Sequence, residues 1–142
     1  MADTSLGFRF RGRKCGAPPT IQNILCKDSE TLTKGDMANL ESGEIDLGAA
    51  ADANFLGAIL ETQAGTDSTT RFKVIVDADA IYGVYDASAR LKGATLDIAG
   101  ATGAQTIATS SGKEFVVFAE SAADEETLVC FNTGKHVDNK AQ

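Results

Sequence analysis

Residues 115–132 read FVVFAESAADEETLVCFN, and this stretch indicates the class of fold. Two runs rich in aromatic and β-branched residues, 115–119 and 127–132, flank an acidic segment at 124–126. Short apolar runs bounded by polar segments are typical of β-strands. The stretch therefore predicts two strands joined by an acidic loop.

The same pattern extends back along most of the chain. Further strands are expected at 21–26, 31–33, 37–40, 45–47, 55–61, 72–76, 81–85, 96–98 and 106–108. At 44–47, acidic and apolar residues alternate, which is typical of a strand with one face in water. Only 87–92 is expected to be briefly helical. Many short strands without a βαβ pattern predict an all-β fold, a compact β-barrel or β-sandwich of short antiparallel strands.

A chain of 142 residues is about one domain long. We expect an extended basic N-terminal arm at 1–19, a β-rich domain at 20–132 and a polar C-terminal tail at 133–142. In the arm, Phe8 and Phe10 alternate with Arg9 and Arg11, which is the period of an extended strand. The arm is expected to lie extended, or to become ordered on binding, and the domain is expected to fold without it.

Charge is segregated along the sequence. Residues 1–27 carry a net charge of +4, and residues 28–142 carry −11. An acidic body repels phosphate and anionic lipid, so neither a nucleic acid nor a membrane is expected as a partner. The arm alone could contact nucleic acid through its arginines and phenylalanines, but only weakly. It is instead expected to lie along an acidic or edge-strand surface of a partner subunit, or else to be a solvated tail. The expected partner-binding residues are Phe8, Arg9, Phe10, Arg11, Arg13 and Lys14.

Catalytic chemistry finds little support in the sequence. Nucleophilic hydrolysis needs a base beside the nucleophile, and the single histidine, His136, lies in a tail whose composition suggests exposure. The string Ser110–Lys113 lacks the earlier glycine and the final hydroxyl residue of a phosphate-binding loop. We therefore expect no enzyme, no catalytic residue and no cofactor.

Metal binding is equally unsupported by spacing. Cys15, Cys26 and Cys130 are widely separated, without a CxxC pair, so buried or incidental thiols are expected, and a disulfide remains open. Asp77, Asp79 and Asp86 do not follow the spacing of a calcium loop and are expected to be solvated loop carboxylates.

Two regions carry a family resemblance. Residues 31–47, TLTKGDMANLESGEIDL, contain a strand ending in KGD followed by a Ser-Gly turn, and residues 55–58 read FLGA. The second half contains IYGVYD at 81–86, RLKG at 90–93, LDIAG at 96–100, TGAQ at 102–105, FVV at 115–117, TLV at 127–129 and GKH at 134–136. In these motifs the chain resembles the head decoration proteins of tailed bacteriophages, also called capsid cement or stabilising proteins.

The resemblance implies a structural virion protein on the outer surface of the capsid, made in the host cytoplasm. Its partners are then the major capsid protein and neighbouring decoration subunits, and members of the family commonly assemble as homotrimers. The subunit bridges major capsid proteins and stabilises the mature shell. This function needs buried area across subunit boundaries and no reactive group.

A second hypothesis is a β-barrel binding module of the virion surface, for carbohydrate or host adhesion. Such sites favour exposed aromatic side chains, and the chain has no tryptophan. Tyr82 and Tyr85 are the candidates for such contacts, although both are expected to pack in the core.

Overall fold

The computed structural model describes residues 7–27, 30–50, 52–61, 63–65, 70–108 and 113–138. Within these ranges the chain is all-β, with thirteen strands and no helix, so the expected fold class is confirmed. Every pairing between named strands is antiparallel. No helix in the described ranges is long and apolar enough to span a bilayer.

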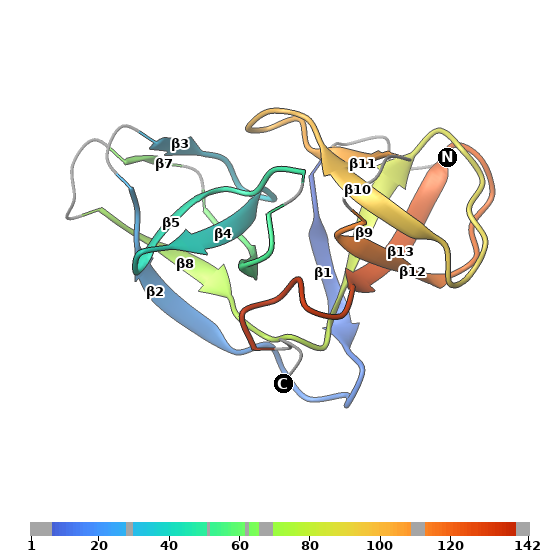
Figure 1. Cartoon of the computed structure of the whole chain (residues 1–142), viewed down its shortest axis with the longest axis horizontal. Helices are drawn as coiled ribbons and strands as arrows, with labels where there is room; N and C mark the ends of the chain where they lie inside the picture. The colour runs from blue at the N-terminus through green and yellow to red at the C-terminus, as the bar shows by residue number, and fades with distance from the viewer. Residues whose placement is uncertain are drawn as a thin grey trace.

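One half of the molecule is a six-stranded sheet, on the right in Figure 1. Its strands, in spatial order, are β1 (Arg9–Arg13), β9 (Ala80–Asp86), β13 (Glu125–Phe131), β12 (Phe115–Ala119), β10 (Thr95–Ala99) and β11 (Thr106–Ala108). The two strands expected from residues 115–132 therefore pair at its centre. Phe115 lies opposite Phe131, and Val117 lies opposite Val129.

The other half contains three smaller sheets, on the left in Figure 1. They are β2 (Ile21–Leu25) with β8 (Arg71–Ile75), β3 (Glu30–Leu32) with β7 (Gln63–Gly65), and β4 (Met37–Glu41) between β5 (Glu44–Leu47) and β6 (Phe55–Ala58). The expected turn at Ser42 and Gly43 is confirmed. Both residues have positive φ, 53° and 80°, and join β4 to β5 as a two-residue hairpin.

Each half has its own hydrophobic core. The first core contains an aromatic group in which Phe115 lies 5.1 Å from Phe8, 5.5 Å from Phe131 and 6.1 Å from Phe55 between ring centroids. The second core is mainly aliphatic and includes Leu32, Ile45, Leu56, Ile59 and Val74. The two cores explain why the run at 55–59 is continuously apolar rather than alternating.

β6 lies between these cores. Phe55 and Ala58 belong to the first core, whereas Leu56 and Ile59 belong to the second. A strand covered on both faces needs apolar residues at every position. Gly57 allows this close packing, because a Cβ atom there would lie 1.9 Å from the backbone oxygen of Ile75.

Two local expectations are wrong. Residues 87–92 form bends and an isolated bridge between Arg90 and Ser121 rather than a helix.

The second wrong expectation concerns the C-terminal segment. Up to Asp138, the last residue that the structure describes, this segment is part of the fold and not a free polar tail. Phe55 donates its N–H to the Lys135 oxygen at 2.9 Å, and Val137 donates to the Phe55 oxygen at 3.1 Å. In Figure 1 this segment, in red, passes between the two halves of the molecule. Residues 139–142 of the expected tail, and 66–69 of the expected exposed turn, lie outside the described ranges.

Candidate interaction surface at the first strand

The N-terminal arm is an integral part of the domain. Arg9–Arg13 form β1, which pairs with β9 and contains a register shift between Phe10 and Gly12. Phe8 is 2% exposed, and its ring also meets Tyr82 edge to face at 6.3 Å. The extended conformation expected from the alternating sequence is present, but its pairing partner is this chain's own sheet.

Arg9 and Arg11 project to the other face of β1 and share one carboxylate. Arg11 donates from Nε and Nη2 to Glu126 at 2.7 and 2.6 Å, and Arg9 donates from Nη2 at 3.1 Å. Hydrogen bonds from Arg11 and then from Arg9 hold the pKa of the Glu126 carboxyl below its usual value. Gly83 on β9 leaves room for this arrangement, because a Cβ atom there would lie 2.2 Å from Glu126 Oε1.

Arg13 ties the end of β1 to the loop before β9. Its Nε donates to Asp79 at 2.7 Å, and its Nη1 lies 3.4 Å from Asp77 Oδ1. Asp77 also accepts the N–H of Thr20 at 2.7 Å, so it fixes the start of β2 as well. The neighbouring Lys14 side chain is exposed.

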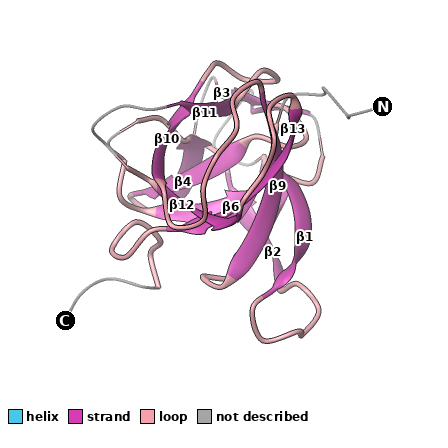
Figure 2. Cartoon of the chain, turned by 90° about the vertical axis from the view of Figure 1, so that its right-hand side faces the viewer, coloured by secondary structure: helices cyan, strands magenta, loops and turns pink. Residues whose placement is uncertain are grey.

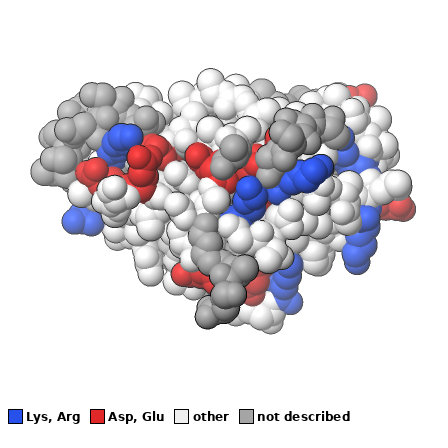
Figure 3. Space-filling model, in the orientation of Figure 1, with Lys and Arg blue, Asp and Glu red and all other residues white. Residues whose placement is uncertain are grey.

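These contacts divide the expected partner-binding residues into two groups. Phe8 lies in the core, so the expectation that its ring serves a partner needs correction. Arg9 and Arg13 are partly buried against acids of the same chain, and their role in partner binding stays a prediction. Arg11, whose side chain is 44% exposed, Lys14 and the partly buried Phe10 remain accessible. On the face drawn in Figure 3, acidic and basic side chains are interspersed, although the sequence segregates them.

Two of the three loop carboxylates are not solvated as expected. Asp77 and Asp86 are buried, at 7% and 6% exposure. Asp86 accepts hydrogen bonds from the Arg90 guanidinium and from the Ser88 N–H, so it closes the bend that replaces the expected helix. In the described part of the chain, no group of three or more His, Cys, Asp or Glu side chains could hold a metal ion.

The tyrosines and cysteines take different environments. Tyr82 is fully buried, as expected, and its hydroxyl accepts the Ala58 N–H at 3.1 Å. Tyr85 instead lies on the opposite face of β9 and donates to Asp124 at 2.9 Å. Cys26 and Cys130 are buried, Cys15 is exposed, and no disulfide joins any two of these three cysteines.

His136 is a core residue, and its expected exposure is wrong. It is 0% exposed, its Nε2 lies 2.7 Å from the Leu56 oxygen, and its Nδ1 accepts the Asp138 N–H at 3.0 Å. This pairing requires the neutral ring with its proton on Nε2. The histidine therefore holds the C-terminal segment against β6.

We expect His136 to make the domain sensitive to mild acid. Burial lowers its pKa from the ordinary 6.5, so between the folded pKa and 6.5 only the unfolded chain takes up the proton. Its contribution to stability is complete above pH 6.5 and is lost as the pH falls through the folded pKa, with a slope approaching about 1.4 kcal/mol per pH unit. Urea unfolding of His136→Gln should lack this slope. An equal slope in both proteins would contradict the assignment.

Two of the motifs behind the family resemblance, KGD and TGAQ, meet in a partly buried polar contact. Asp36, from KGD, accepts hydrogen bonds from Thr102 Oγ1 at 2.5 Å, Gly103 N at 2.8 Å and Thr33 N at 2.8 Å. Gln105, the last residue of TGAQ, accepts the Met37 N–H at 2.6 Å. Asp36 and Gln105 are both fully buried. We refer to the contacts made by these two side chains as the polar lock.

Gln105 also donates from Nε2 to the Gly48 oxygen at 2.7 Å, so it connects both ends of the β4–β5 hairpin to the 102–105 turn. The sequence marks Gln105 only as the last residue of the TGAQ motif of the resemblance. Its burial and its two hydrogen-bond partners are visible only in the fold.

Substituting Gln105→Leu should destabilise the domain by about 2 kcal/mol, because it leaves the Met37 N–H and the Gly48 oxygen without a partner. Chemical denaturation followed by circular dichroism measures the loss. Gln22→Leu, at an exposed position of β2, is the matched control and should change stability by less than about 0.5 kcal/mol. Equal stabilities for the two variants would contradict a stabilising role of the lock.

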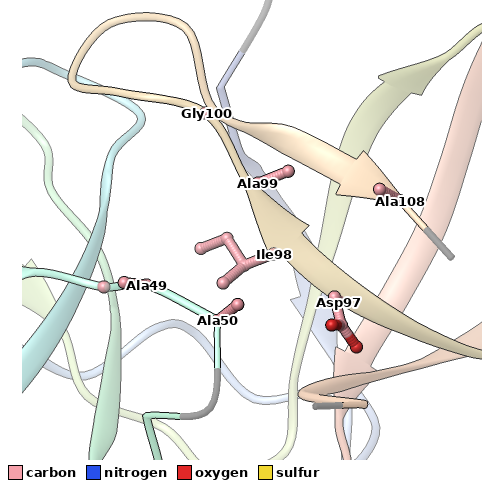
Figure 4. A pocket seen from close by; sticks show the side chains of 8 residues that line it. Ala49, Ala50, Asp97, Ile98, Ala99, Gly100 and Ala108 are labelled. Carbon is pink, nitrogen blue, oxygen red and sulfur yellow. The ribbon is translucent and has the colours of Figure 1, made fainter. Parts of the chain in front are cut away.

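A concavity of about 340 Å³ lies between the 48–50 loop and β10. Figure 4 shows Ile98 directed toward Ala49 and Ala50, with Asp97 directed away from them. Asp97 is 3% exposed and accepts the backbone N–H of Lys113, so its carboxylate is used inside the fold. The remaining lining residues are small, which provides shape but few groups for recognition.

No protein-family model matches the chain, and no curated protein matches it.

Proposed function

We propose that this chain is a capsid decoration subunit of a tailed bacteriophage, a structural virion protein that binds the outside of the head. The observation that carries the proposal is the polar lock. KGD and TGAQ, two motifs on which the resemblance rests, are 66 residues apart at Asp36 and Thr102 and are in contact in the fold. Two segments far apart in the sequence, both part of the resemblance, therefore belong to one tertiary contact of this chain, which supports treating them as one pattern.

The architecture supports this function on physical grounds. A cement subunit stabilises the shell by burying area across joints between major capsid proteins, and many copies make the total gain large. A subunit that binds only the mature lattice stabilises that lattice by mass action. Assembly as a trimer, as the resemblance implies, multiplies the contacts made by each particle.

In this proposal, only the accessible residues of the arm contribute to attachment to the head. Arg11 and Lys14 carry exposed positive charge, and Phe10 offers a partly buried ring. Phe8, which lies in the core, stabilises the subunit that presents them.

Co-sedimentation with expanded heads lacking decoration protein tests the function directly. Heads assembled from the major capsid protein encoded in the same genome should bind the chain in stoichiometric amounts and should then resist heating better. Unexpanded heads are the matched control. Failure to bind either form, with the protein folded, would contradict the proposal.

The adhesion module receives no support from the tyrosines. Tyr82 is fully buried, and the Tyr85 hydroxyl is bonded to Asp124. We therefore propose no carbohydrate site.

A further inference from the structure

β1 is an edge of the six-stranded sheet. Among the strands that the structure describes, only β9 pairs with it, and Figure 2 shows it at the margin of the sheet beside β9. An edge strand carries backbone N–H and C=O groups to which an extended segment of another chain can pair. The register shift near Arg11 and the charges on β1 are features that commonly prevent an edge strand from pairing with another chain. The surface beside β1 nevertheless favours pairing with a partner segment.

A groove follows β1. It has a volume of about 480 Å³ and lies between residues 7–10 on one side and Lys34, Gly35 and residues 58–60 on the other. Phe10 and Leu60 are partly buried there and pack against the first core. Lys34 is exposed at its rim. The volume lies within the range of sites that enclose apolar ligand groups, about 300–1,000 Å³.

The two faces of β1 differ in chemistry. Phe8 and Phe10 point to the core and groove side, whereas Arg9 and Arg11 point to the side of Glu126. Both guanidinium groups contact the Glu126 carboxylate, and the Arg11 side chain stays 44% exposed beside it. An added strand places alternate side chains on the same two faces. Apolar residues would then enter the groove, and acidic residues would lie beside the arginines.

We propose that β1 and this groove receive an extended partner segment in which apolar and acidic residues alternate. The partner is a different protein rather than a second copy paired through β1. Antiparallel pairing of two β1 strands would bring Arg9, Arg11 and Arg13 close to their own copies, and like charges across a ladder are destabilising. This inference deepens the proposed function, and it rests on that function only in assigning the segment to the capsid.

A capped, fluorescently labelled peptide of alternating leucine and glutamate tests the recognition chemistry without any head. Fluorescence anisotropy with the full chain should show saturable binding that weakens as salt is added. Replacing every glutamate by lysine, or a central residue by proline, should weaken binding by about tenfold or more, because it removes charge pairing or backbone pairing. Equal binding of all three peptides would overturn the proposal.

Variants of the chain locate the site. Leu60→Glu and Lys34→Glu should each weaken peptide binding by about fivefold or more, by closing the groove to apolar groups and by reversing the charge of its rim. Leu91→Glu is the matched control, because Leu91 is 73% exposed and lies outside the groove, and it should bind normally. Lys34 is exposed, so its variant remains informative if Leu60→Glu is poorly folded. Unchanged binding by Lys34→Glu and folded Leu60→Glu would overturn the assignment.

The same variants separate this inference from the proposed function. If the chain binds the peptide but does not attach to heads, the assignment of the groove stands and the capsid role is contradicted. If the Lys34→Glu and Leu60→Glu variants still attach to heads, and the chain does not bind the peptide, the assignment of the groove is contradicted but the capsid role is not. Concentration-dependent dimers in sedimentation that these variants abolish would show that a second copy occupies the groove, and would overturn the choice of partner.

Discussion

Replacing Gly57 by alanine should cost the domain about 3 kcal/mol or more. A Cβ atom at this position would lie 1.9 Å from the Ile75 backbone oxygen and 2.5 Å from the Tyr82 hydroxyl. Neither group can move freely, because Ile75 belongs to β8 and the Tyr82 ring is enclosed in the first core. Overpacking of a tight core costs about 1–3 kcal/mol even where the neighbours can adjust. The melting temperature should fall by roughly 10 °C, measured by calorimetry.

Gly93→Ala is the control for this prediction. Gly93 has a φ of +88°, but a Cβ atom there would meet no heavy atom within 4 Å. Its substitution therefore adds backbone strain without a clash and should cost about 1 kcal/mol. If Gly57→Ala is no less stable than Gly93→Ala, then the close approach of β6 to β8 is not as the structure has it.

Local alternation was enough to predict most strands. The run at 115–119 is a strand with the expected bounds, and 127–132 corresponds to β13, Glu125–Phe131. Period-two patterns and turn residues act over a few residues, so a single sequence reveals them. The local sequence misled at 87–92, where Asp86 and Arg90 form an ion pair that closes a bend in place of the expected helical turn.

The position of each residue in three dimensions could not be predicted in the same way. Asp36 and Thr102 have ordinary turn sequences around them, and only the packing of β4 beside the 102–105 turn makes them partners. His136 looked exposed because its neighbours Lys135 and Asp138 are polar. In the structure, the backbone of this segment pairs with Phe55, and that pairing buries the ring. Composition reports the average environment of a segment, whereas burial is decided residue by residue.

The arm illustrates the same limit. An alternating pattern of Phe and Arg predicts an extended strand with one apolar and one basic face, and β1 has both. The pattern does not say which sheet edge the strand joins. A partner's edge and the chain's own β9 would both satisfy it. In this chain the strand joins β9, where Gly83 leaves space for Glu126 to reach both arginines.

Deleting residues 1–14 should therefore unfold or severely destabilise the domain, contrary to the expectation that it folds without the arm. The deletion removes the Phe8 ring from the first core and the whole of β1 from β9. Loss of a buried phenylalanine alone costs about 3–5 kcal/mol. Domains of this kind are stable by only about 5–15 kcal/mol in total. Heteronuclear NMR spectra and urea titration would measure the loss.

Single substitutions separate the two contributions of the arm. Phe8→Ala should lower the free energy of unfolding by about 4 kcal/mol. Phe10→Ala, at a partly buried position of the same strand, should cost about half as much, because less apolar area is removed from the interior. Equal small losses for both variants would mean that the arm is peripheral to the domain. If instead Phe8→Ala alone is strongly destabilising, then a truncated protein that no longer attaches to heads has lost its fold. In that case, only variants that keep Phe8 can measure how much the arm contributes to binding.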